Sequence, residues 1–131
     1  MSCELCESDG GKVLWRDDLC RVVRPMVDGY PGFVRVIVNR HVKEMTDLAE
    51  RDRLMHVVFA CESVLRRLYQ PEKMNLASFG NVVPHVHWHV IARFVDDAQF
   101  PDAIWAPARR AAKPPAAVSD EVLARAIMAA L

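Results

Sequence analysis

The stretch that decides the fold is His85-Val86-His87-Trp88-His89-Val90-Ile91, in which three of the chain's five histidines alternate with apolar residues. Successive side chains of a β-strand point to opposite faces, so His85, His87 and His89 are expected to share one face. Neighbouring rings on that face would lie about 7 Å apart. An imidazole is costly to bury without polar partners, and three in strict alternation therefore indicate a functional surface.

The segments around this stretch predict an α+β fold with a five-stranded antiparallel sheet, one long helix and a short C-terminal helix. Apolar runs rich in β-branched residues predict strands over 13–16, 20–24, 33–38, 73–79 and 85–94. Between the third and fourth strands, apolar residues recur at helical spacing until Pro71 ends the helix. Thr46 or Asp47 is expected to cap this helix, with Glu50 completing a capping box from Asp47.

The length of 131 residues predicts a single domain over 1–131. Its core is expected over about 3–95, followed by an irregular segment over 96–118 that is rich in Pro and Ala and by a short helix over 119–131. Lys and Arg number 17, as do Asp and Glu, so no overall field favours nucleic acid or a membrane surface as a partner. With no visible signal peptide and no apolar run that could span a bilayer, we expect a cytoplasmic protein.

The histidines leave three interpretations open. They can form a solvated polar face, or His-x-His can supply two metal ligands. In the third, an imidazole acts as nucleophile or acid-base group, since histidine titrates near neutrality and attacks phosphorus when unprotonated. No Asp or Glu lies within four residues of the triplet to complete a catalytic zinc set.

The four cysteines divide into two kinds. Cys20 and Cys61 lie in apolar strand and helix patterns, where a small buried side chain is usual. Cys3 and Cys6 have the Cys-x-x-Cys spacing that lets two thiolates converge on one ion. This spacing supplies half of a zinc site, and the residues alone do not name the other half.

The alternating stretch resembles the His-φ-His-φ-His-φ-φ signature of the histidine triad (HIT) family of nucleotide hydrolases and transferases, where φ is an apolar residue. The likeness extends to Pro31-Gly32-Phe33-Val34-Arg35-Val36, to Arg40-His41-Val42 followed by Thr46-Asp47-Leu48, and to Arg93. It covers roughly residues 3–95 and implies a HIT-like fold.

The resemblance implies that His87 attacks the α-phosphorus of a nucleoside phosphoramidate or dinucleoside polyphosphate and forms a nucleotidyl-histidine intermediate. His89 would contact the phosphate and the leaving group, and His85 would support the site. Asn75 would lie near the ribose and phosphate, and Asn81 would contact the bridging oxygen. Asp28 is a candidate for the ribose. No cofactor would be required for the chemistry.

The loop Phe79-Gly80-Asn81-Val82-Val83-Pro84 departs from the family's pattern, because Val82 lacks the hydroxyl expected to donate to phosphate. This departure favours an alternative function, a weakly catalytic or non-catalytic nucleotide-binding or interaction module stabilised by zinc. A metal-dependent hydrolase using His85 and His89 is a third hypothesis.

Two further expectations come from the resemblance. Cys3, Cys6, His41 and His85 match, in order, a structural zinc site found in some members. Members also pair as two-fold homodimers in which the C-terminal segment often crosses to the partner's active site. In this chain that segment carries Trp105, Arg109, Arg110 and Lys113.

Overall fold

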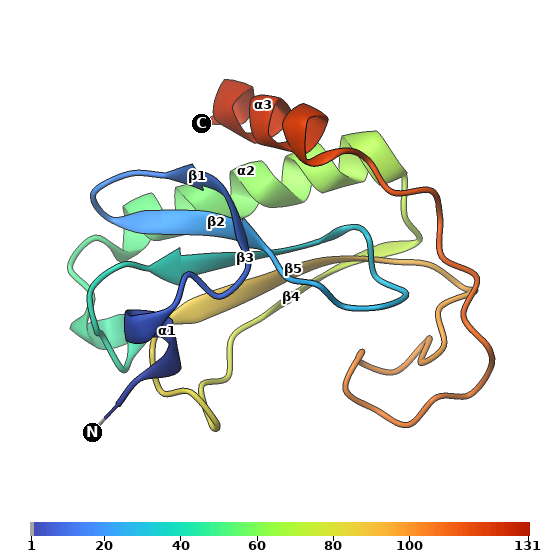
Figure 1. Ribbon diagram of the computed structural model, residues 1–131, viewed down its shortest axis with the longest axis horizontal. Coiled ribbons are helices and arrows are strands. Elements are labelled where there is room, and N and C mark those ends of the chain that lie inside the picture. The colour runs from blue at the N-terminus through green and yellow to red at the C-terminus, as the bar shows by residue number, and fades with distance from the viewer. Residues whose placement is uncertain (1) are drawn as a thin grey trace.

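Five strands form one antiparallel sheet in the computed structural model, which describes residues 2–131 (Figure 1). The strands are β1 (Lys12–Arg16), β2 (Cys20–Arg24), β3 (Phe33–Val38), β4 (Lys73–Ala77) and β5 (His87–Arg93). Their order across the sheet is β1-β2-β3-β5-β4, so β5 lies between β3 and β4. The predicted α+β fold is confirmed.

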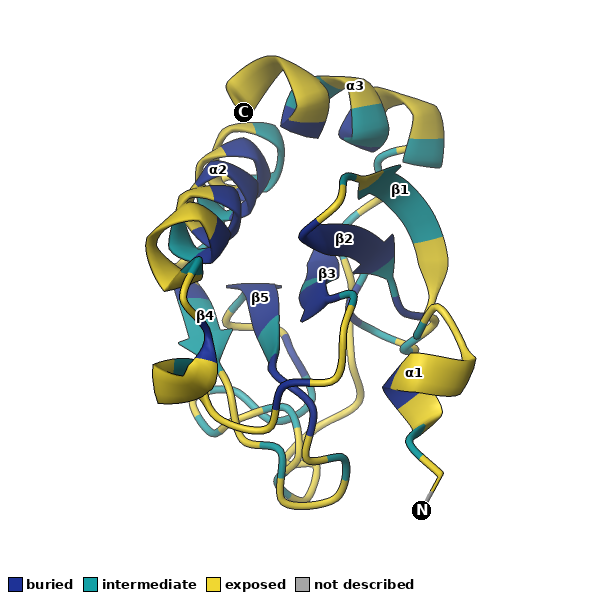
Figure 2. Ribbon diagram, turned by 90° about the vertical axis from the view of Figure 1, so that its left-hand side faces the viewer, coloured by how far each residue is buried: buried dark blue, intermediate teal, exposed yellow. Residues whose placement is uncertain are grey.

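The two long helices cover one face of this sheet and leave much of the other face uncovered. α2 (Arg51–Tyr69) packs across β3 and β5, and α3 (Asp120–Ala130) packs beside α2 over β1 (Figures 1 and 2). A one-turn α1 (Glu4–Glu7) and a 3-10 turn η1 (Met45–Asp47) complete the elements. The main core lies between this face and the helices, where Val36 of β3, Leu54 of α2 and Leu123 of α3 are fully buried. Burial of this apolar stripe explains why α2 forms where its periodicity predicts.

Arg24 joins α3 to the rest of the fold. Its Nη1 donates to the Val118 carbonyl at 2.7 Å and to Asp120 Oδ1 at 2.9 Å. Its Nη2 donates to the Pro31 carbonyl at 2.7 Å and to the Tyr69 hydroxyl at 3.1 Å. One guanidinium thus connects β2 to three other parts of the chain, at residues 31, 69 and 118–120.

The predicted capping box is wrong. α2 begins at Arg51, and Glu50 stands at its N-cap without a side-chain cap bond. The Glu50 carboxylate instead accepts two hydrogen bonds from Arg40, at 2.9 and 2.8 Å. Asp47 is the last residue of η1, which precedes the helix, so it does not stand at the helix N-terminus.

The last strand is shorter than predicted, and its boundary separates the three histidines. β5 begins at His87, because the His85 amide donates to the Val83 carbonyl at 2.8 Å and the Val86 amide to the Val42 carbonyl at 2.7 Å. These bonds take His85 out of the strand ladder. β4 likewise ends at Ala77, before the predicted 79.

Candidate functional site

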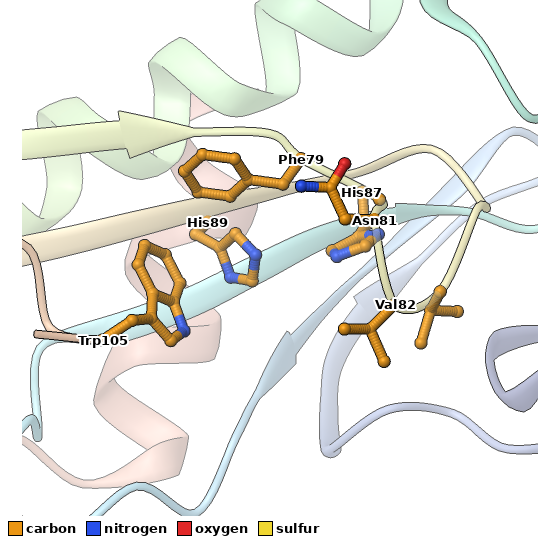
Figure 3. A pocket seen from close by; sticks show the side chains of 8 residues that line it. Phe79, Asn81, Val82, His87, His89 and Trp105 are labelled. Carbon is orange, nitrogen blue, oxygen red and sulfur yellow. The ribbon is translucent and has the colours of Figure 1, made fainter.

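His87 and His89 line a cavity of about 390 Å³ on the sheet face that α2 does not cover (Figure 3). Phe79 and Trp105 flank His89 in this view, and Asn81 and Val82 lie toward His87. The lining residues are Phe79, Gly80, Asn81, Val82, Val83, His87, His89 and Trp105. The volume is within the range of small-molecule sites. The lining is mostly apolar, and its polar side chains include Asn81, His87 and His89.

A backbone contact determines which nitrogen of the His87 ring carries the hydrogen. Its Nδ1 lies 2.6 Å from the carbonyl oxygen of His85. A carbonyl can only accept, so Nδ1 carries the hydrogen. In the neutral ring the lone pair therefore resides on Nε2, the atom available for attack on an electrophile.

His89 is held as a neutral ring among other rings. It is buried, its centroid lies 5.0 Å from that of His87, and the ring of Phe33 stands edge-on at 5.7 Å. Burial, together with the neighbouring His87 and Arg35, lowers the pKa of His89 to about 4. At neutral pH His89 can therefore act as a hydrogen-bond donor or acceptor without carrying a charge.

His85 lies away from the cavity and belongs to a second cluster. It is 1% exposed, and its Nε2 lies 2.5 Å from the Val38 carbonyl, which assigns the ring hydrogen to Nε2. Nδ1 is then free to face Cys3 Sγ at 3.4 Å and Cys6 Sγ at 3.5 Å. Of the three histidines expected on one face, His87 and His89 meet at the cavity. His85 contributes its carbonyl, which accepts the hydrogen bond from His87.

Cys3, Cys6, His41 and His85 could hold a metal ion such as zinc. Their ligand atoms all lie within 4.8 Å of one another, and His41 Nδ1 is 3.5 Å from Cys6 Sγ. A tetrahedral zinc with ordinary bond lengths separates sulfur and nitrogen ligands by about 3.5 Å, so the donor set fits. The contact from His85 Nε2 to the Val38 carbonyl is the kind of outer-shell bond that orients a ligating imidazole.

Arg21 holds the cysteine segment in place, a role that sequence reasoning missed. It is 4% exposed, and its guanidinium donates to the carbonyls of Leu5 at 2.6 Å, Ser8 at 3.2 Å and Asp9 at 3.0 Å. These carbonyls lie within α1 or just after it, where backbone oxygens lack helical partners. A charged residue within the apolar strand pattern of 20–24 is the signal that could have indicated it.

The other two cysteines are buried and unreactive. Burial raises the pKa of Cys20 and Cys61 to about 12 in each case. Both remain thiols at neutral pH, as the sequence patterns predicted for small buried side chains.

The structure does not bring Asn75 or Asp28 to the cavity. Asn75 Oδ1 accepts from Arg93 Nη1 at 2.8 Å, and Asp28 lies exposed in a turn. Their part in substrate binding stays a prediction. Asn81 does line the cavity, so one of the three predicted substrate-binding residues lies next to His87.

The segment after β5 brings Trp105 to the cavity of its own chain. Arg93, 1% exposed, organises this segment by donating to Asp97 Oδ2 at 2.9 Å and to the Asp102 carbonyl at 2.7 Å. Phe79 and Trp105 meet edge-to-face with their centroids 5.3 Å apart. The resemblance placed Trp105 in the segment expected to cross to a partner's active site. Sequence reasoning missed Phe79, which stands next to a glycine in a loop and carries no periodic signal.

An antiparallel sheet with β5 between β3 and β4, a covering helix and histidines at a cavity define the class of histidine triad proteins. The HIT domain family model matches residues 8–96, and the chain belongs to the HIT family, whose members are typically nucleotide hydrolases or transferases. A search of curated proteins gave no match.

Solved histidine triad proteins resemble the chain over nearly its whole length. One from Bradyrhizobium japonicum is 26% identical with a TM-score of 0.70, covering 93% of this chain and 89% of its own. One from Sinorhizobium meliloti is also 26% identical with a TM-score of 0.70, covering 100% and 96%. A third, from Marinobacter aquaeolei, is 22% identical with a TM-score of 0.68, covers 100% and 95%, and supports the fold alone.

None of the helices within residues 2–131 combines the length and the apolar character needed to cross a membrane.

Proposed function

We propose that the protein is a nucleotide hydrolase or transferase that cleaves at the α-phosphorus of a nucleoside phosphoramidate or dinucleoside polyphosphate. The observation that carries this proposal is the 2.6 Å contact between His87 Nδ1 and the His85 carbonyl. It leaves the Nε2 lone pair of His87 free beside an accessible cavity, which is the requirement for a histidine nucleophile.

The reaction has two displacements at phosphorus. His87 Nε2 first forms a bond to the α-phosphorus, and the bond to the leaving group breaks with its electron pair, the leaving atom taking a proton from solvent. Water then attacks the same phosphorus and gives a proton back to solvent, the bond from phosphorus to Nε2 breaks with its electron pair returning to Nε2, and a nucleoside monophosphate is released. An acceptor other than water would make the reaction a transfer. The covalent imidazole route requires no metal-activated water.

The neighbouring polar groups have distinct roles in this proposal. His89, 5.0 Å from His87 between ring centroids, contacts the phosphate and the leaving group. Asn81 supplies an amide donor from the cavity wall for the bridging oxygen. His85 positions His87 through its carbonyl, while its side chain belongs to the metal cluster.

We infer that Cys3, Cys6, His41 and His85 bind a structural zinc ion. Bound there, the ion would fix α1 and the segment before β5 to each other, which is the usual contribution of a closed Cys and His site. Elemental analysis of the purified protein tests this, with one zinc per chain expected.

The alternative is a zinc-stabilised nucleotide-binding module with little catalysis. It is favoured by Val82, whose side chain is 92% exposed at the cavity rim and offers no hydroxyl to a phosphate. Binding of nucleotides without any covalent adduct would support it.

Trapping of the covalent intermediate separates the two functions. The protein is mixed with adenosine phosphoramidate and with diadenosine polyphosphates, quenched rapidly, and digested for mass spectrometry. We expect an adenylyl group on the peptide that contains His87. His56→Ala is the matched control, because His56 is exposed on α2 away from the cavity. An adduct that also forms in His87→Ala would refute the assignment of the nucleophile.

A further inference from the structure

Arg35 rises from the sheet beside the two cavity histidines. It is the direct cross-strand partner of His89, as Ile37 is of His87. Such partners share one face, with Cβ atoms about 4.5–5.5 Å apart. The guanidinium carbon lies 5.7 Å from the centre of the Phe33 ring, which itself stands edge-on to His89. Arg35 therefore shares a sheet face with the proposed nucleophile, although it is not among the lining residues of the cavity. It was not selected from the sequence.

The hydrogen-bonding groups of Arg35 are largely unused. Within residues 2–131 its one hydrogen bond runs from Nη1 to the Gly10 carbonyl at 3.2 Å. Its Nε is buried and has no partner among the described residues. None of the ion pairs found in this part of the chain includes Arg35. Glu4 is the acidic side chain that acts on this half-buried cation, and it lies beyond ion-pair distance, so the fold maintains Arg35 at a cost.

The other buried and half-buried strand arginines of the sheet show what a structural role looks like. Arg21 has four oxygen acceptors in Leu5, Ser8, Asp9 and Asn39. Arg93 donates to Asp97, Asn75 and Asp102, and Arg24 to four oxygens. Arg35 lacks a comparable set, and the difference indicates a partner that is not part of the described chain.

The cavity lacks a fixed cation of its own. Its lining residues include no Lys or Arg, and His89 is neutral near pH 7. In the segment after β5, Arg109 donates to Asp102 Oδ2 at 2.9 Å and Arg110 to the Phe100 carbonyl at 2.7 Å, and neither lines the cavity. Val82 supplies no hydroxyl. A phosphate held at His87 meets the neutral donors of Asn81 and His89 there, so a fixed positive charge has to come from another element.

We propose that Arg35 is an anion-binding residue of the nucleotide site, whose guanidinium donates to the phosphate oxygens of a nucleoside 5′-phosphate lying over His87 and His89. This inference rests on the proposed function for the choice of ligand, and it names the group that holds the phosphate. Binding requires no covalent step, so the inference is tested apart from catalysis.

The test compares a charged and an uncharged ligand by isothermal titration calorimetry. In the Arg35→Gln protein, affinity for adenosine 5′-monophosphate should fall about 10- to 100-fold, the loss of one charged hydrogen-bonding contact. Affinity for adenosine should change less than about twofold. Arg35→Lys keeps the charge and should lose less than Arg35→Gln. Arg125→Gln, which removes an exposed cation from α3, should match wild type for both ligands.

Three outcomes decide the inference. Equal affinity of wild type and Arg35→Gln for the monophosphate would overturn it and leave the proposed function standing. Equal losses for adenosine and the monophosphate would also overturn it, because they would indicate damage to the fold, which thermal unfolding would reveal. A selective loss of monophosphate affinity would support it even if no nucleotidyl-histidine adduct formed, a result that would refute only the catalytic proposal.

Discussion

The carbonyl oxygen of His85 accepts a hydrogen bond from Nδ1 of His87 at 2.6 Å, while the imidazole of the same His85 faces Cys3 and Cys6. One residue thus belongs both to the metal cluster and to the support of the proposed nucleophile. Any change that moves the backbone at His85 is expected to alter the orientation of the His87 ring.

Replacing His87 by Ala should reduce turnover of adenosine phosphoramidate by about 10³-fold or more, since the covalent route loses its nucleophile. Nucleotide affinity should stay close to that of wild type. Steady-state kinetics together with calorimetric binding checks this prediction. Turnover at the wild-type rate would show that the mechanism is wrong.

Removal of the metal should lower both stability and turnover. With Cys3→Ser or Cys6→Ser we expect loss of bound zinc, a lower Tm, and a fall in kcat larger than the change in KM, because His85 no longer holds His87 in place. Zinc content, thermal unfolding and kinetics measure the three effects. Glu7→Gln, an exposed change on the same helix, is the control. Normal kcat in a zinc-free, folded variant would contradict the coupling.

Acid should destabilise the fold through His89. Its pKa is about 4 in the folded protein and near 6.5 in the unfolded chain, so the unfolded chain binds more protons between these values. The free energy of unfolding should therefore fall as the pH decreases from about 6.5 to about 4. Urea unfolding of wild type and His89→Gln over this window checks it, and the variant should lose less. Parallel pH dependences would count against the neutral, buried ring.

The Arg93–Asp97 ion pair should be essential for the segment that carries Trp105. Both side chains are almost fully buried, and removing one partner of a buried pair costs about 3–5 kcal/mol. Asp97→Asn should therefore lower the free energy of unfolding by that order and change Trp fluorescence. Asp102→Asn removes a partner of an exposed pair and should cost less than about 1 kcal/mol. Equal costs in chemical denaturation would refute this assignment.

The two aromatic rings at the cavity should influence the choice of leaving group. Phe79 is 63% and Trp105 53% exposed, and both line the cavity. Phe79→Ala or Trp105→Ala should lower kcat/KM for a phosphoramidate of an aromatic amine by about 2- to 10-fold, the value of an aromatic contact. Turnover of the unsubstituted phosphoramidate should change little. Val122→Ala, an exposed apolar change on α3, serves as control. Uniform losses for both substrates would argue against this role.

The regular elements were predictable because their apolar patterns match their burial. β2 and β3 have the predicted bounds, and α2 follows the predicted spacing until Pro71. The cluster of Cys3, Cys6, His41 and His85 was predictable from the resemblance, because each residue matches a position of the family's zinc pattern and the fold brings the four together.

Other features depend on contacts that no local pattern reveals. α1 has only four residues, too few for a periodicity. His85 leaves the strand because its amide bonds to the Val83 carbonyl and the Val86 amide bonds to the Val42 carbonyl, far away in sequence. Among the described residues Arg35 has one hydrogen bond and no ion pair, which depends on its surroundings in three dimensions. Its position in the strand pattern of 33–38 gives no sign of this.

The hydrogen bonds of Arg24 have a consequence for biosynthesis. Two of its four acceptors, the Val118 carbonyl and Asp120, come late in the chain, as do the fully buried Leu123 and Ile127. A nascent polypeptide can pair the strands early, but it cannot seal its interior until residue 127 has left the ribosome. Ribosomes stalled before that point should carry a protease-sensitive intermediate.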